Sequence, residues 1–128
     1  MNGKLIFVDS GVLITATRGQ EPVLRAPQHL VASSEFMRLE VMPKAVWTGN
    51  RTEQDFYEAF FSVVSAWPTD NEAVIRQAHN EAAACGLGSL DALHIAAAVL
   101  LGAAELVTIE KPTKSIHRTR SIKDMTLR

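Results

Sequence analysis

In Leu5-Ile6-Phe7-Val8-Asp9-Ser10-Gly11, a short apolar run ends in a carboxylate, and this pattern indicates the class of fold. Four successive apolar residues with β-branched and aromatic members are typical of a strand that is buried on both faces. The acidic residue that follows would lie at the edge of a sheet, where open α/β folds bind their ligands. Asp9 is equally suited to capping the helix that starts after it, so both roles stay open at this point.

Three more acidic residues lie beside apolar segments. Glu40 lies in FMRLEVM, Asp91 lies in the first turn of a helix predicted to be capped by Ser89, and Glu110 follows the strand-like run of residues 105–108. The helix dipole alone would account for Asp91, whereas a Glu among core-facing residues is costly unless it is paired or bound to a metal. Several carboxylates at one edge of a sheet repel one another unless a cation holds them, so a metal site is the first hypothesis.

The type of ligand indicates which metal and which chemistry. Hard oxygen ligands, with no cysteine cluster and no pair of histidines, suit Mg²⁺ or Mn²⁺ better than Zn²⁺. Carboxylate clusters that hold such ions serve phosphodiester hydrolysis. The segment Gly86-Leu87-Gly88-Ser89 lacks the lysine of a phosphate-binding loop. A third and weaker interpretation is a receiver-like phosphoryl-transfer protein that uses the same acids for Mg²⁺.

Short apolar runs alternate with helical patterns along the whole chain. This predicts a single domain over residues 1–128 with an α/β fold, a three-layer α/β/α sandwich around a central, mostly parallel sheet. Further strands are expected at residues 29–32 and 105–108, and an edge strand at residues 121–127. Residues 18–28 are expected to form a loop.

Several residues predict where the helices begin and end. Pro43 is expected to end or kink the helix that carries Glu40. Thr52 to Asp55 resembles a capping box, and Asp70 and Gly86 are expected to bound another helix. Trp47 and Trp67 fit helical apolar patterns, so we expect core packing for both rather than stacking on bases.

Composition and charge limit the class of protein. The chain is 47% hydrophobic and 21% charged, as in ordinary globular proteins. Residues 1–110 carry a net charge of −6 and residues 111–128 a net charge of +5, so the C-terminal segment is either a patch for polyanions or a solvated strand. Cys85 is the only cysteine, which excludes an intrachain disulfide. The longest apolar stretch is too short to span a membrane and no signal peptide is visible, so a cytoplasmic protein is expected.

With these acidic residues and their flanking segments, the chain resembles a PIN domain. The matching pieces are LIFVDSGVLI with Asp9, SSEFMRLEVMPKA with Glu40, SLDALHIAAAVLLGAAELVT with Asp91, and TIEKP with Glu110, in an order and spacing that cover nearly the full chain. The resemblance implies metal-dependent ribonuclease cleavage of single strands. It also implies, as for many small members of the family, a toxin that is neutralised by a cognate antitoxin and that forms a homodimer.

The resemblance assigns roles residue by residue. Asp9, Glu40 and Asp91 match the three principal acids and would hold the metal. Glu110 falls where the family usually has Asp or Asn, so its coordination would be direct, through water or absent. Gly11 lies where many members have Asn. Ser10 and Thr108 match hydroxyl-bearing positions that orient the acids.

Other side chains complete the list of candidates. His94 shares a helix face with Asp91 and is a candidate to support the site, although a polar core or rim histidine is the more ordinary role. Arg38, Lys44, Lys111 and Lys114 are the candidate phosphate contacts for RNA. The competing hypothesis is a catalytically silent module that keeps the fold and binds only protein; the Glu at position 110 permits it.

Overall fold

The protein is built around a four-stranded sheet with the strand order β2-β1-β3-β4, in which every neighbouring pair runs parallel. The structure is a computed structural model, and it describes residues 4–17 and 30–126. The predicted α/β fold is confirmed, and the described part of its sheet is parallel throughout. The elements are, in chain order, β1 (Leu5–Val8), α1 (Ser10–Ala16), β2 (Leu30–Ala32), α2 (Glu35–Trp47), α3 (Arg51–Val63), α4 (Asn71–Cys85), α5 (Ser89–Leu100), β3 (Glu105–Thr108), the 3-10 helix η2 (Ser115–Arg118) and β4 (Lys123–Thr126).

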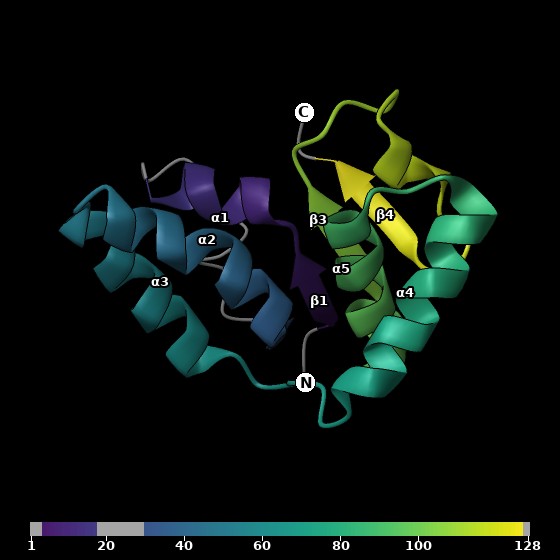
Figure 1. Cartoon of the computed structure of the whole chain (residues 1–128), viewed down its shortest axis with the longest axis horizontal. Coiled ribbons are helices and arrows are strands. Elements are labelled where there is room, and N and C mark those ends of the chain that lie inside the picture. The colour runs from purple at the N-terminus through teal and green to yellow at the C-terminus, as the bar shows by residue number, and fades with distance from the viewer. Residues whose placement is uncertain (1–3, 18–29, 127–128) are drawn as a thin grey trace.

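The two central strands, β1 and β3, lie in the middle of the core. The apolar residues Ile6, Phe7 and Val8 of β1 are buried, as are all four residues of β3. Figure 1 shows α1, α2 and α3 gathered on one side of β1, with α4 and α5 beside β3 and β4. Because parallel strands end at the same edge, the chain after β1 lies against the end of β3, and the Asp9 N–H donates to the Val107 carbonyl at 2.8 Å.

The outer strands agree with the sequence prediction where the structure describes them. The predicted C-terminal edge strand is β4, which pairs with β3 in the register Thr108 to Thr126. The predicted second strand is β2, which pairs with β1. The expected loop at residues 18–28 and the predicted strand start at His29 lie outside the described residues.

Pro43 does not end its helix, so that part of the prediction was wrong, and the alternative of a kink stays a prediction. Helix α2 continues through Pro43 to Trp47. A proline inside a helix frees the carbonyl four residues earlier, which here belongs to Leu39. Leu39 is 66% exposed and Pro43 is also exposed, so water can bond the freed carbonyl on the outer face of the helix.

The predicted starts of α3 and α5 were wrong in detail. Asn50 caps α3 with its side chain: Oδ1 accepts from the Glu53 N–H at 3.0 Å, and Nδ2 donates to the Glu53 carboxylate at 2.8 Å. This reciprocal pair begins two residues before the predicted capping box at Thr52. Helix α5 starts after Gly88, which provides no side-chain cap, so Ser89 is the first helical residue. The predicted bounds of α4 are confirmed, with Asp70 as N-cap and Gly86 in the left-handed conformation (φ 66°) as C-cap.

Trp47 lies on the surface, so the prediction that it packs in the core was wrong. Its exposed fraction is 88%, and Leu39 and Val46 on the same helix are 66% and 57% exposed. We call these three residues the α2 apolar face. Trp67, by contrast, packs against the core, with its ring 5.9 Å from that of Phe61.

Within the described part of the chain, no single helix is long and apolar enough to cross a membrane. Helices α4 and α5 reach that length and composition only when counted together across a break where they bend by 118°.

Candidate active site at the carboxyl edge of the sheet

Asp9 is the buried acid of the site. It follows β1 directly and is 4% exposed. Its Oδ1 accepts from the Ser10 N–H at 2.9 Å, which caps α1, and its Oδ2 accepts from the Thr108 hydroxyl at 3.1 Å. Burial raises the pKa of Asp9, and the neighbouring His94 and these hydrogen bonds offset only part of that effect. Each carboxylate oxygen has two lone pairs, so capping does not exclude a ligand.

Glu40 projects from α2 to the same edge. Its Oε2 accepts from the Ser10 hydroxyl at 3.0 Å, and its Oε1 lies 2.7 Å from His94 Nε2. The hydrogen bond from His94 lowers the pKa of Glu40. His94 Nδ1 is buried and has no hydrogen-bond partner among the described residues, so we place the ring proton on Nε2, facing Glu40.

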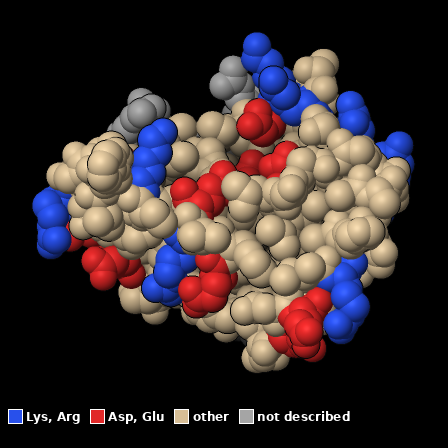
Figure 2. Space-filling model, in the orientation of Figure 1, with Lys and Arg blue, Asp and Glu red and all other residues tan. Residues whose placement is uncertain are grey.

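Asp91 lies in the first turn of α5 and is half-buried. Burial raises the pKa of Asp91, and the charges of Asp9, Glu40 and Glu110 raise it further, against an opposing effect of His94. Asp91 thus lies close enough to three carboxylates from other segments for their charges to act on it. In Figure 2 several acidic side chains gather near the middle of the visible face, and both acidic and basic side chains lie around them.

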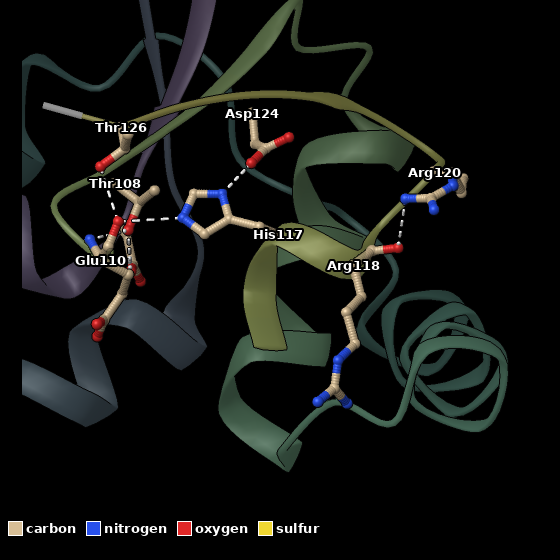
Figure 3. Close-up of polar contacts among 8 residues, drawn as sticks. Thr108, Glu110, His117, Arg118, Arg120, Asp124 and Thr126 are labelled. Carbon is tan, nitrogen blue, oxygen red and sulfur yellow. Dashed lines mark hydrogen bonds and ion pairs between the residues drawn. The ribbon is translucent and has the colours of Figure 1, made fainter. Parts of the chain in front are cut away.

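Glu110 lies in the loop after β3 and is exposed. Its backbone is held from both sides. Its N–H donates to the Thr108 hydroxyl at 3.0 Å, and its carbonyl accepts from the Thr126 hydroxyl at 2.7 Å and from His117 Nε2 at 3.1 Å (Figure 3). Thr108 thus joins the loop of Glu110 to Asp9 through one hydroxyl.

The donor set fits a hard divalent cation in chemistry, since it consists of carboxylate oxygens that repel one another. Among residues 4–17 and 30–126, however, no three His, Cys, Asp or Glu side chains are already arranged as a metal-binding group. A cation would therefore have to draw the carboxylates closer together than they lie here.

The glycine at position 11 has a structural reason. A Cβ atom built on Gly11 would lie 2.8 Å from Cγ1 of Ile109, which is closer than real Cβ contacts. Gly11 therefore lets the start of α1 pack against the loop that carries Glu110, and an Asn there would force the Ile109 side chain to shift.

The four candidate phosphate contacts lie in different settings. Lys111 and Lys114 line a pocket beside Glu110, and both are exposed, as is Lys44 on α2. Arg38 is already engaged: its Nε lies 3.3 Å from the Glu35 carboxylate, and its guanidinium lies 4.8 Å and 5.2 Å from the ring centres of Phe61 and Trp67. A role of any of the four in RNA binding stays a prediction.

Sequence reasoning missed three residues beside the site, namely His117, Asp124 and Thr126. His117 and Thr126 contact the Glu110 carbonyl, and Asp124 contacts His117. These contacts form because β4 lies next to β3 and η2 lies in the connection between the two strands. The excess of basic residues after position 110 drew attention to the lysines and arginines of this segment, whereas His117 carries no spacing signal of its own.

Comparison with known proteins finds relatives in structure only. No family model and no curated protein sequence matches the chain. One similar structure is VapBC2 from Rickettsia felis bound to a DNA fragment from its promoter. A chain of it superposes with a TM-score of 0.72 at 16% identity, over 95% of this chain and 98% of that one. DNA-bound VapBC from Salmonella typhimurium gives 0.70 at 17% identity, over 98% of both chains. PAE2754 from Pyrobaculum aerophilum gives 0.63 at 16% identity, over 97% of this chain and 92% of that one.

These likenesses extend over almost the whole of each chain, so they compare complete folds rather than a shared motif. They agree with the resemblance drawn from the sequence. The protein has the PIN fold.

Proposed function

We propose that the chain is a Mg²⁺- or Mn²⁺-dependent endoribonuclease that cleaves phosphodiester bonds of single-stranded RNA. The observation that carries this proposal is the convergence of carboxylates from separate segments at one sheet edge. Ser10 contacts both Asp9 and Glu40, and Thr108 joins Asp9 to the loop of Glu110. Burial raises the pKa of Asp91, and the charges of neighbouring carboxylates add to that effect. A cation would neutralise this repulsion, and groups perturbed in this way cluster at functional sites.

Asp9, Asp91 and Glu40 would hold the cation. When bound, the cation would polarise the phosphate and lower the pKa of an attacking water. Glu110 would complete the acidic edge from the loop after β3. The expected products carry a 5′-phosphate and a 3′-hydroxyl.

The supporting residues of this chain fix the acids in place. Ser10 and His94 hold the two oxygens of Glu40, at 3.0 Å and 2.7 Å. Thr108 holds Asp9, and its buried hydroxyl also accepts from the Glu110 N–H. These hydrogen bonds orient Glu40 and Asp9 toward the sheet edge, and a bound cation would then draw the carboxylates together.

RNA would approach across the face that carries Glu110. Lys111 and Lys114 flank that residue and would contact the phosphates on either side of the cleaved bond. Lys44 is the next candidate, and Arg38 the weakest because its guanidinium already stacks on two rings. The proposal places the protein in the cytoplasm with its RNA substrate.

We further propose that the protein is the toxin of a toxin–antitoxin pair. Two of the structural neighbours described above are VapBC assemblies. The α2 apolar face supports a protein partner, because exposed apolar residues that cluster on one helix mark interaction surfaces. Trp47→Ser should prevent binding of the antitoxin, for which the product of the adjacent upstream gene is the candidate, and should leave RNA cleavage intact.

A homodimer is also proposed, and sedimentation velocity at several concentrations tests it. A single monomeric species at all concentrations would reject the dimer. Since the α2 apolar face could be shared between a second copy and an antitoxin, the measurement should be repeated with Trp47→Ser.

The second candidate function is a catalytically silent PIN-fold module that binds protein only. It is favoured by the absence of a preformed metal group among the described residues and by the Glu at position 110. RNA cleavage with added Mn²⁺ separates the two functions. Asp9→Asn and Asp91→Asn should abolish cleavage by an active wild-type protein while the circular dichroism spectrum is kept; cleavage at the wild-type rate by either variant would reject the proposed site.

A further inference from the structure

His117 forms a bridge between the edge strand of the sheet and the loop of Glu110. Its Nδ1 is hydrogen-bonded to the Asp124 carboxylate on β4, and its Nε2 lies 3.1 Å from the Glu110 carbonyl oxygen. Figure 3 shows the ring lying between these two groups, whereas the side chain of Arg118 points away from them.

Both partners of the His117 ring accept hydrogen bonds, since one is a carboxylate and the other a carbonyl. Both ring nitrogens therefore donate, which fixes the ring in one orientation. Burial lowers the pKa of His117, but the hydrogen bonds to Asp124 and Glu110 outweigh burial and raise it. A doubly donating ring is consistent with that direction.

The position of the ring is itself fixed. Ile116, the residue before His117 in η2, is fully buried in the core, and Asp124 is paired in the sheet opposite Leu106 of β3. His117 is thus tied to rigid parts of the fold on one side. On the other side it contacts a loop whose side chains are exposed.

The loop gains a continuous set of hydrogen bonds to the buried acid. His117 donates to the Asp124 carboxylate and to the Glu110 carbonyl. The Glu110 N–H in turn donates to the Thr108 hydroxyl, which donates to Asp9. The position of the loop therefore sets how near the Glu110 charge lies to the other acids, and that charge adds to burial, Asp9 and Glu40 in raising the pKa of Asp91.

We propose that His117 is a positioning residue that holds Glu110 at the acidic edge of the sheet. The inference that this matters for catalysis rests on the proposed function. The positioning itself does not, and the two are tested by different measurements.

Hydrogen exchange tests the positioning without reference to activity. In His117→Ala, the Glu110 amide should exchange about tenfold faster than in the wild type, because the loop opens when one bond to its carbonyl is lost. Amides of β1 and β3 should keep their wild-type rates. His79→Ala, which removes an exposed histidine from α4, is the matched control and should change neither.

An unchanged rate at Glu110 would overturn the proposal, and so would an equal acceleration throughout β3 and β4, which would reveal a general structural role. If His117→Ala does not fold, Asp124→Ala provides the same test. It removes the group that orients the ring and should accelerate the same amide selectively.

Kinetics then test the catalytic consequence. His117→Ala should lower kcat by about tenfold with KM changed less than twofold, since the bond concerns Glu110 and no substrate contact. In the double variant with Glu110→Gln, kcat should equal that of Glu110→Gln alone, because His117 acts through Glu110. If the losses in kcat of the two single variants add in the double variant, His117 does not act through Glu110. If the wild type cleaves no RNA, the proposed function fails, and the exchange rates still decide the positioning.

Discussion

The hydroxyl of Thr108 allows a quantitative prediction, because one buried group serves two parts of the site. It donates to Asp9 at 3.1 Å and accepts from the Glu110 N–H at 3.0 Å, and Thr108 is fully buried. Thr108→Val keeps the shape of the side chain and removes both bonds. A bond to a charged group contributes about 1.5–3 kcal/mol and a neutral bond about 0.5–1.5 kcal/mol, and the added methyl group offsets part of the loss.

We therefore expect the free energy of unfolding of Thr108→Val at pH 7 to fall by about 2 kcal/mol, since each bond is lost against a small apolar gain. For a domain of this size the melting temperature should fall by about 8 °C. The hydrogen bond lowers the pKa of Asp9 against the larger effect of burial, so its loss should raise that pKa further. The difference between wild type and variant should shrink as the pH falls and Asp9 becomes protonated.

Thermal unfolding followed by circular dichroism from pH 3 to pH 8, with the carboxyl ¹³C shift of Asp9 as a second probe, measures both quantities. Thr108→Ser is the matched control, because it keeps the hydroxyl and loses about 1 kcal/mol with its methyl group. Equal stability of wild type and Thr108→Val would refute the argument, as would a loss in Thr108→Ser as large as that in Thr108→Val.

Three further perturbations test other parts of the site. Asp91→Asn should raise the melting temperature of the metal-free protein by about 3 °C at pH 7. The folded-state pKa of Asp91 lies above its unfolded value, so its charge destabilises the native state at neutral pH, by about 1 kcal/mol after solvent screening. A lower melting temperature than that of the wild type would contradict this. Gly11→Ala should destabilise the protein by about 1–3 kcal/mol in urea unfolding, because its Cβ would meet Ile109, and full stability would show that Ile109 moves freely. Lys111→Ala should weaken RNA binding similarly for all sequences and reduce the salt dependence by about one counterion, whereas a change in sequence preference would point to a base contact instead.

The strands, and the positions of Asp9, Asp91 and Glu110 at element ends, were predictable because each depends on local chemistry. An apolar run ending in Asp9 or preceding Glu110 fixes a strand and its carboxyl end together. Asp91 followed from a helix start. The preference for Glu40 over Glu35 needed the family resemblance, and the structure shows the difference: Glu35 pairs with Arg38 on the surface, whereas Glu40 meets buried His94.

What the sequence could not predict depends on tertiary neighbours. Pro43 continues a helix because the carbonyl that it frees faces solvent, and Trp47 follows an apolar spacing yet has no core beside it. His117 reaches the Glu110 carbonyl only because of the path taken by the β3–β4 connection, which contains η2. Such contacts depend on the path of a loop, which periodicity does not encode.

Binding of a divalent cation at the acidic edge can be measured by calorimetric titration of the wild-type protein with Mn²⁺. The variant Asp91→Asn and the surface variant Asp55→Asn are titrated alongside. We expect stoichiometric binding by the wild type and by Asp55→Asn, and its loss in Asp91→Asn. No heat of binding in the wild type, or unchanged binding in Asp91→Asn, would show that the acidic edge is not a cation site.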